Sequence, residues 1–321
     1  MGQQFSEAGV SADAWRSPLA QRDHLGNQRD WVWRGWSIRY SFLRSPRNDG
    51  LPIVFLHGFG ASLLQWRGNL QPLSQHHTIY ALDLLGFGAS EKASTEFRVS
   101  LWVEQVRAFC QQFIGQPIVL VGHSLGALVA LTAVTRYPEL AQGLILVTLP
   151  ATRQELLPGP VQSVVHSIEN LFANSFLIKQ ILRFARRPSF IRSALQKIYT
   201  DTQYVNEDLV ASFVEPAHHR GADRTLLKLV RARTATDFSD DTRSLLQRLD
   251  IDTLVLWGQN DNIIPIQWGR QLPEFNPYLT MVEIPDAGHC LYDEQAERVN
   301  HEILTWIQQT IDIPHPTQTP V

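Results

Sequence analysis

The sequence predicts an α/β fold in which helices flank a mostly parallel central sheet and a helical cap is inserted into the chain. Short apolar runs, each ended by turn residues, alternate with helix-like stretches. These runs lie at residues 52–56, 78–84, 118–121, 144–147, 253–257 and 280–284. Continuously apolar strands are typical of a sheet that is covered on both faces, and such sheets are largely parallel.

The stretch 150–247 interrupts this alternation. It contains no convincing strand, and its apolar residues recur at helical spacing, so we expect a cap that lies over the sheet. Near the start of the chain, residues 31–33 and 37–42 predict a hairpin around Gly35. The expected organisation is an N-terminal extension (1–28), a core in two parts (29–149 and 248–311), the cap (150–247) and a disordered tail (312–321).

Composition places the chain among ordinary globular proteins. Of its 321 residues 44% are hydrophobic and 18% are charged, and the net charge of −3 gives no sign of nucleic-acid binding. Cys110 and Cys290 are too few for a disulfide framework and lack metal-ligand spacing, so we expect buried thiols and neither a metal nor another cofactor. No apolar run approaches the roughly 20 residues of a spanning helix, and we recognise no signal peptide, which favours the cytoplasm.

The most informative feature is a serine between two glycines. Ser124 stands in Gly122-His123-Ser124-Leu125-Gly126, which follows the apolar run 118–121 and precedes a helix-like stretch at 127–137. This is the G-x-S-x-G pattern in its strand–turn–helix context. A strand that reverses sharply into a helix strains the residue at the turn, and its neighbours must be small. Ser124 is therefore the candidate nucleophile.

A serine hydroxyl needs a base, and the base works best when a carboxylate fixes its tautomer. In a parallel sheet these partners come from loops at the carboxyl ends of other strands. His289 follows the run 280–284, and Asp261 follows the run 253–257. We expect His289 to be the base and Asp261 the carboxylate, with Asp286 and Asp293 as the competing carboxylates.

The reaction also needs two donors for the developing oxyanion. The N–H of Leu125, directly after the nucleophile, is the first candidate. The N–H of Phe59 is the second, because Gly58 and Gly60 on either side of it let the loop after the first central strand turn inward. We expect the preceding His57 to orient this loop rather than to transfer protons.

These motifs together resemble the α/β-hydrolase superfamily, in the order nucleophile, acid, base. The resemblance runs from about residue 31 to about residue 307, and a segment at 83–90 that also matches is expected to be structural. A narrower likeness, carried by residues 65–67, 83–88, 101–105 and 114–117, is to cyanobacterial and plastid hydrolases related to pheophytinase and chlorophyll dephytylase. That likeness adds the plastid stroma as a second expected location.

The resemblance implies a carboxylic-ester hydrolase without a cofactor. Haloalkane dehalogenases and epoxide hydrolases of this superfamily use an aspartate nucleophile, so Ser124 argues against them. Three other serine-triad reactions stay open: carbon–carbon bond hydrolysis, haloperoxidase chemistry and a lyase reaction. A non-catalytic receptor or scaffold with the same fold is the alternative from another class.

The cap suggests an apolar substrate such as a lipid, prenyl or phytyl ester. Five of its side chains are the candidates to line the substrate pocket: Phe172, Phe176, Ile181, Leu182 and Phe184. Residues 150–235 carry 12 lysines and arginines against 7 aspartates and glutamates, a net charge of +5. A basic surface beside apolar residues is a candidate for peripheral contact with an anionic membrane.

Overall fold

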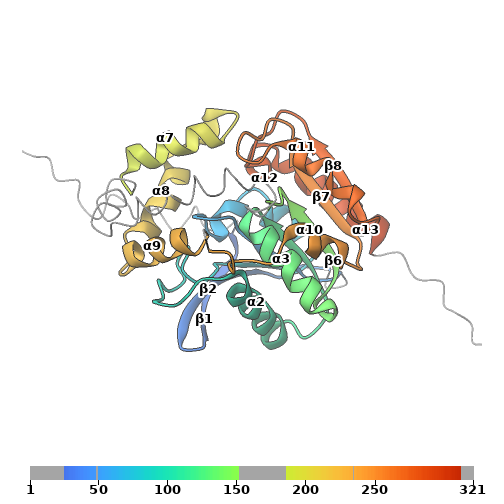
Figure 1. The fold of residues 1–321 in the computed structure, drawn as a ribbon, viewed down its shortest axis with the longest axis horizontal. Coiled ribbons are helices and arrows are strands. Elements are labelled where there is room, and N and C mark those ends of the chain that lie inside the picture. The colour runs from blue at the N-terminus through green and yellow to red at the C-terminus, as the bar shows by residue number, and fades with distance from the viewer. Residues whose placement is uncertain (1–24, 48–49, 152–185, 234, 312–321) are drawn as a thin grey trace, which may run out of the picture.

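The computed structural model describes residues 25–47, 50–151, 186–233 and 235–311 (Figure 1). Within these residues an eight-stranded sheet has the strand order β1-β2-β4-β3-β5-β6-β7-β8. The strands are β1 (Asn27–Trp33), β2 (Trp36–Leu43), β3 (Ile53–Leu56), β4 (Ile79–Leu82), β5 (Ile118–His123), β6 (Ala141–Val147), β7 (Thr253–Gly258) and β8 (Leu279–Ile284). The predicted α/β fold with a mostly parallel sheet is confirmed.

Six neighbouring strands run parallel, in the sheet order β4-β3-β5-β6-β7-β8, and β1 and β2 form an antiparallel edge beside β4. The hairpin predicted around Gly35 joins β1 to β2. Arg34 and Gly35 both adopt left-handed backbone angles, with φ of 51° and 84°, as a two-residue hairpin turn requires. The first strand begins at Asn27, two residues before the predicted start of the core.

Helices cover both faces of the sheet, which explains why the strands are continuously apolar. Within β5, Leu120 packs into the core on one face, and its neighbours Val119 and Val121 pack into the core on the other. Alternate residues of a strand point to opposite faces, so both sets must be apolar when both faces are covered. The helices of this part are α1 (Leu70–Leu73), α2 (Val99–Phe113), α3 (Leu125–Arg136), α10 (Thr242–Gln247), α11 (Ile266–Gly269), α12 (Leu291–Glu294) and α13 (Ala296–Thr310).

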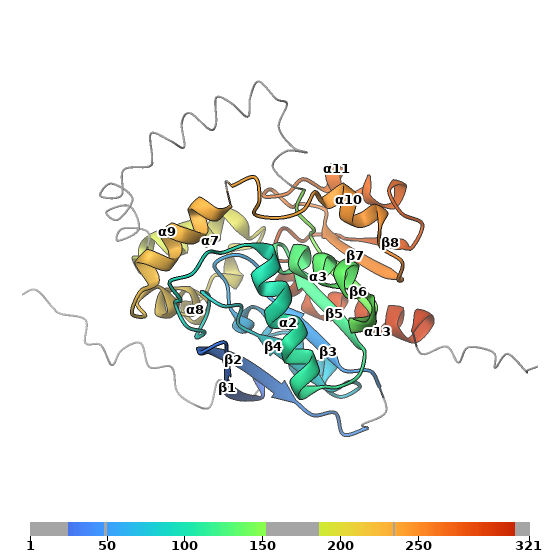
Figure 2. The ribbon, with the colours of Figure 1, turned by 60° about the horizontal axis from the view of Figure 1, so that its bottom comes forward.

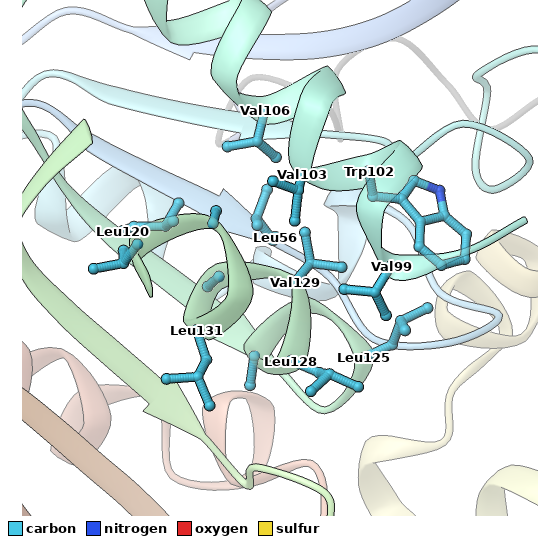
Figure 3. Close-up of a cluster of buried hydrophobic side chains, with 14 of the residues drawn as sticks. Leu56, Val99, Trp102, Val103, Val106, Leu120, Leu125, Leu128, Val129 and Leu131 are labelled. Carbon is cyan, nitrogen blue, oxygen red and sulfur yellow. The ribbon is translucent and has the colours of Figure 1, made fainter. Parts of the chain in front are cut away.

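The first of these cores lies beneath α2 and α3 (Figure 3). Trp102 and Val106 of α2 and Val129 of α3 are buried there with Leu56 and Leu120 of the sheet. On the opposite face α1 and α13 cover the sheet with a second buried cluster. The two cores fix the positions of the strand ends, from which the site is built.

Between β6 and β7 the described residues are helical. Three helices, α7 (Pro188–Ile198), α8 (Glu207–Ala217) and α9 (Ala222–Ala232), lie together at one side of the sheet (Figures 1 and 2). Buried residues of α7 and α8, such as Leu195 and Val210, join the core that α13 covers. The following helix, α10, packs instead against α3, through Leu245 and Leu246 in the other core. None of the helices in the described ranges is both long and apolar enough to cross a bilayer.

Candidate active site

Ser124 lies at the sharp turn between β5 and α3. Its backbone has φ 51° and ψ −114°, a strained conformation that persists only where the surroundings enforce it. A Cβ atom on Gly122 would lie 2.2 Å from the carbonyl oxygen of Gly126, and one on Gly126 would lie 2.4 Å from the carbonyl oxygen of Leu56. Both positions therefore require glycine, for the steric reason that the sequence motif indicated.

The carboxylate of Asp261 faces the ring of His289 in the loops that follow β7 and β8. Asp261 Oδ2 lies 2.9 Å from His289 Nδ1. Asp261 Oδ1 accepts backbone N–H bonds of 2.8 Å from Ile263 and from Ile264. An ionised carboxylate can only accept, so His289 Nδ1 carries the hydrogen and Nε2 keeps its lone pair. This is the tautomer that a general base needs.

The two competing carboxylates have different partners. Asp286 is exposed and has a positive φ of 54°. Asp293 accepts bonds of 2.8 and 2.7 Å from Arg67 and one of 2.9 Å from the hydroxyl of Tyr199. Of the three carboxylates considered from the sequence, Asp261 is the one that hydrogen-bonds to His289.

A second histidine joins the turn at Ser124 to the loop that carries His289. The rings of His123 and His289 lie 4.7 Å apart, and His123 Nε2 donates to the backbone oxygen of His289 at 3.1 Å. Burial, together with the nearby His289, lowers the pKa of His123 well below its ordinary value, so its ring is neutral. Sequence reasoning missed this role, and the position of His123 beside Ser124 was the only available signal.

Ser124 and His289 are thus brought to the same place through His123. Both residues lie in the part of the chain that the structure describes, and there no hydrogen bond joins the Ser124 hydroxyl to the His289 ring. Catalytic hydrogen bonds are often long in ligand-free enzymes and tighten when substrate binds. The assignment of Ser124, His289 and Asp261 as nucleophile, base and orienting acid stays a prediction.

The two predicted oxyanion donors lie beside the nucleophile. Leu125 is the first residue of α3, and Phe59 lies in the loop after β3. A Cβ atom on Gly58 would lie 3.5 Å from Ser124 Cβ, so this loop abuts the nucleophile. Gln65 Oε1 accepts the Gly58 N–H at 3.0 Å and holds the loop in place. The role of the two N–H groups as oxyanion donors stays a prediction.

His57 ties this loop to the segment after β4. The Leu84 N–H donates to His57 Nε2 at 3.0 Å, and His57 Nδ1 lies 2.7 Å from the carbonyl oxygen of Gly58. Because Nε2 accepts, Nδ1 carries the hydrogen. Burial lowers the pKa of His57 to about 4, so the ring is neutral at pH 7. The geometry supports an orienting role for His57.

The segment 83–90 acts through a buried carboxylate. Asp83 accepts the N–H of Leu63 at 2.6 Å and that of Ala89 at 2.7 Å. Burial raises the pKa of Asp83 to about 6, although both hydrogen bonds act in the opposite direction. Asp83 therefore joins the segment after β3 to the segment after β4, consistent with the structural role expected from the sequence.

The five side chains predicted to line the substrate pocket lie outside the described residues: Phe172, Phe176, Ile181, Leu182 and Phe184. In the described part of the cap, the Arg233 guanidinium lies 4.7 Å above the ring of Phe59. The end of α9 therefore lies against the predicted oxyanion loop. Contact of the basic cap with a membrane stays a prediction.

The cysteines and the metal-ligating residue types show no competing site. Cys110 and Cys290 are buried and form no disulfide, and burial raises the pKa of each thiol to about 12. Both thiols are therefore protonated and poorly reactive at pH 7. In the ranges that the structure describes, no group of three histidine, cysteine, aspartate or glutamate side chains could hold a metal ion.

Curated relatives include several hydrolases. The chain is 25% identical over 300 residues to the chloroplastic pheophytinase of Arabidopsis thaliana, a match that covers 81% of this chain and 62% of that protein. It therefore spans less than two thirds of the length of that relative. It is 26% identical over 317 residues to the (lyso)-N-acylphosphatidylethanolamine lipase of Homo sapiens, a match that covers 88% of this chain and 84% of the lipase.

Solved structures show the same architecture. A meta-cleavage product hydrolase from Pseudomonas fluorescens matches with a TM-score of 0.72 and 18% identity, over 89% of this chain and 98% of that chain. At this identity the likeness shows the fold alone. The family model described as alpha/beta hydrolase fold matches residues 52–296, which include Ser124, Asp261 and His289. The chain therefore belongs to the alpha/beta hydrolase fold family.

Proposed function

We propose that this protein is a serine hydrolase that cleaves carboxylic esters through Ser124, His289 and Asp261. The observation that carries the proposal is the 2.9 Å bond between Asp261 Oδ2 and His289 Nδ1, in loops beside the strained turn that holds Ser124. The three residues follow the carboxyl ends of parallel strands, where the sites of open α/β sheets collect. The family assignment supports a hydrolase more broadly.

The proposed reaction has two stages. Ser124 Oγ attacks the ester carbonyl, and His289 Nε2 takes the hydroxyl proton while Asp261 stabilises the imidazolium. The backbone N–H groups of Phe59 and Leu125 hold the oxyanion. His289 then protonates the departing alcohol, which leaves an acyl group on Ser124. Water, activated by the same His289, attacks this acyl group and releases the acid.

We further propose an apolar substrate, such as a lipid, prenyl or chlorophyll phytyl ester. Two relatives, the pheophytinase and the (lyso)-N-acylphosphatidylethanolamine lipase, support a substrate with a long hydrocarbon group. A basic cap surface would bring the protein to an anionic membrane where such substrates reside.

The test is hydrolysis of p-nitrophenyl esters with acyl chains from C2 to C16, by the wild type and by Ser124→Ala. We expect turnover that increases with chain length and that the variant loses by about 10⁶-fold, as in comparable triads. A rate that peaks at C2 would contradict the apolar substrate and leave a small-ester hydrolase. No turnover of any ester would contradict ester cleavage and favour carbon–carbon bond hydrolysis or a receptor.

A further inference from the structure

The two loops that carry Asp261 and His289 are both attached to the same short piece of the cap. This piece, residues 197–201, is the end of α7 and the three residues that follow it. Asn262, beside Asp261, donates through Nδ2 to the backbone oxygen of Lys197 at 2.6 Å. The second attachment is made by Glu294, five positions after His289 in the chain.

Glu294 binds the cap and the loop of the base at the same time. Its Oε1 accepts the backbone N–H of Thr200 at 2.5 Å and that of Asp201 at 3.1 Å. Its Oε2 accepts the backbone N–H of Gly288, which directly precedes His289, at 2.8 Å. Glu294 is only 4% exposed, and a buried carboxylate is stable only when hydrogen bonds replace its water. These three N–H donors supply them.

The packing at this point leaves little freedom. A Cβ atom on Gly288 would lie 2.6 Å from Thr200 Oγ1 and 3.3 Å from the backbone oxygen of Ile198. The backbone before His289 is therefore in direct contact with the cap, so a displacement of the cap has to displace it or break the hydrogen bonds of Glu294.

A neighbouring contact offers a natural control. Tyr199, in the same piece of the cap, donates through its hydroxyl to Asp293, which also binds Arg67. This bond joins the cap to the core as the bonds of Glu294 do. The same hydroxyl also faces the side chain of Cys290, but both of its partners are side chains. Glu294 instead binds the backbone directly before His289, so the bond of Tyr199 should hold the cap without fixing the base.

We propose that Glu294 is a positioning residue that couples the cap to His289, so that the docked cap holds the base where it can activate Ser124. This inference rests on the proposed function, because it assigns a role in the same reaction. Glutamine at this position keeps the size of the side chain but has one carbonyl oxygen. Its side-chain NH2 group would therefore face the backbone N–H of either Gly288 or the cap. Two donors cannot hydrogen-bond to each other, so one of the two attachments would be lost.

The test measures two quantities on wild type, Glu294→Gln and Tyr199→Phe. The first is the rate at which a small fluorophosphonate labels Ser124, which depends on the base but needs no large pocket. The second is the pair of kinetic constants for p-nitrophenyl acetate, with the changes in kcat and in KM determined separately. We expect labelling and kcat to fall by about 10- to 100-fold in Glu294→Gln, as a small misplacement of a catalytic group does, with KM within about twofold. In Tyr199→Phe both should stay within about twofold of the wild type.

Four results would overturn the inference. Labelling of Glu294→Gln at the wild-type rate would remove the positioning role. An equal loss in Tyr199→Phe would mean that cap attachment alone matters. If Glu294→Gln does not fold, Asn262→Ala replaces it, because Asn262 is exposed and makes the other attachment to the cap. We expect slower labelling of Ser124 in this variant, and an unchanged rate would contradict the coupling. Absence of labelling in the wild type would instead overturn the proposed function, and with it the inference.

Discussion

Asp261 uses both carboxylate oxygens, one for His289 at 2.9 Å and the other for two backbone N–H groups of its own loop. The N–H bonds fix the direction of the carboxylate, so Oδ2 faces His289 Nδ1. The direction of the carboxylate is therefore set by its own loop, which follows β7.

Asp261→Asn should leave the fold intact and lower kcat by about 10⁴-fold, because an amide can stabilise the wrong tautomer of the base. The matched control is Asp286→Asn, since Asp286 is exposed and asparagine tolerates its positive φ. Hydrolysis of p-nitrophenyl esters measures both. Equal activity in the two variants would show that Asp261 does not orient the base.

The turn at Ser124 makes a steric prediction. Gly122→Ala should lower both stability and activity severely, because the new Cβ would lie 2.2 Å from the oxygen of Gly126. Gly115→Ala is the control, since its φ of 69° is strained for alanine but no atom lies within 4 Å of the new Cβ. Strain of this kind costs about 1–3 kcal/mol. Chemical denaturation compares the two, and a Gly122→Ala loss no larger than that of Gly115→Ala would contradict the close approach.

The buried His57 makes the stability of the fold depend on pH. Its pKa is about 4 in the folded protein and 6.5 for an ordinary histidine. Between these values the unfolded chain binds the proton and the folded one does not, so stability is present above pH 6.5 and is lost as the pH falls. The expected slope is about 1.4 kcal/mol per pH unit from this residue.

The measurement for this prediction is the free energy of unfolding at pH 7 and pH 5, for the wild type and for His57→Gln. The variant should be less stable at pH 7, because it loses the fit of the ring to Leu84 and Gly58, but its slope with pH should be shallower by about one proton. Parallel slopes in the two proteins would show that His57 is not held neutral.

The ion pair between Arg67 and Asp293 predicts a coupling between the two parts of the core. Asp293 is nearly buried and Arg67 is partly exposed, with side-chain exposures of 6% and 22%. Arg67→Met should destabilise the protein by about 2–4 kcal/mol, because it leaves a buried carboxylate with only Tyr199 as its partner. The double variant with Asp293→Leu should recover part of this loss in a double-mutant cycle. An additive cycle would mean that the pair contributes nothing.

Much of the fold could be predicted because its signals are local. Each strand is an apolar run that ends at turn residues, and the hairpin has a two-residue turn at Gly35. The strained turn at Ser124 was also predictable, since it requires small residues at 122 and 126. Strand ends moved by up to four residues, as at Asn27, because hydrogen bonding rather than hydrophobicity decides where pairing starts.

Contacts between distant parts of the chain could not be predicted. Arg67 and Asp293 are separated by 226 positions, and Glu294 meets the cap 94 positions away. No local pattern marks which buried carboxylate finds which N–H group. The sequence favoured Asp261 over Asp286 and Asp293, but only the placement of the loops in space shows its hydrogen bond to His289. His123 was overlooked because its partner is a backbone oxygen, which has no sequence signature.

The most direct test of the proposed mechanism is to trap the acyl group. The wild type, mixed with p-nitrophenyl acetate and quenched in acid at early times, is digested and analysed by mass spectrometry. We expect an acetylated peptide in which the label is on Ser124, and its absence in Ser124→Ala. An acetyl group on another residue, or undiminished hydrolysis by Ser124→Ala, would contradict the role of Ser124 as the nucleophile.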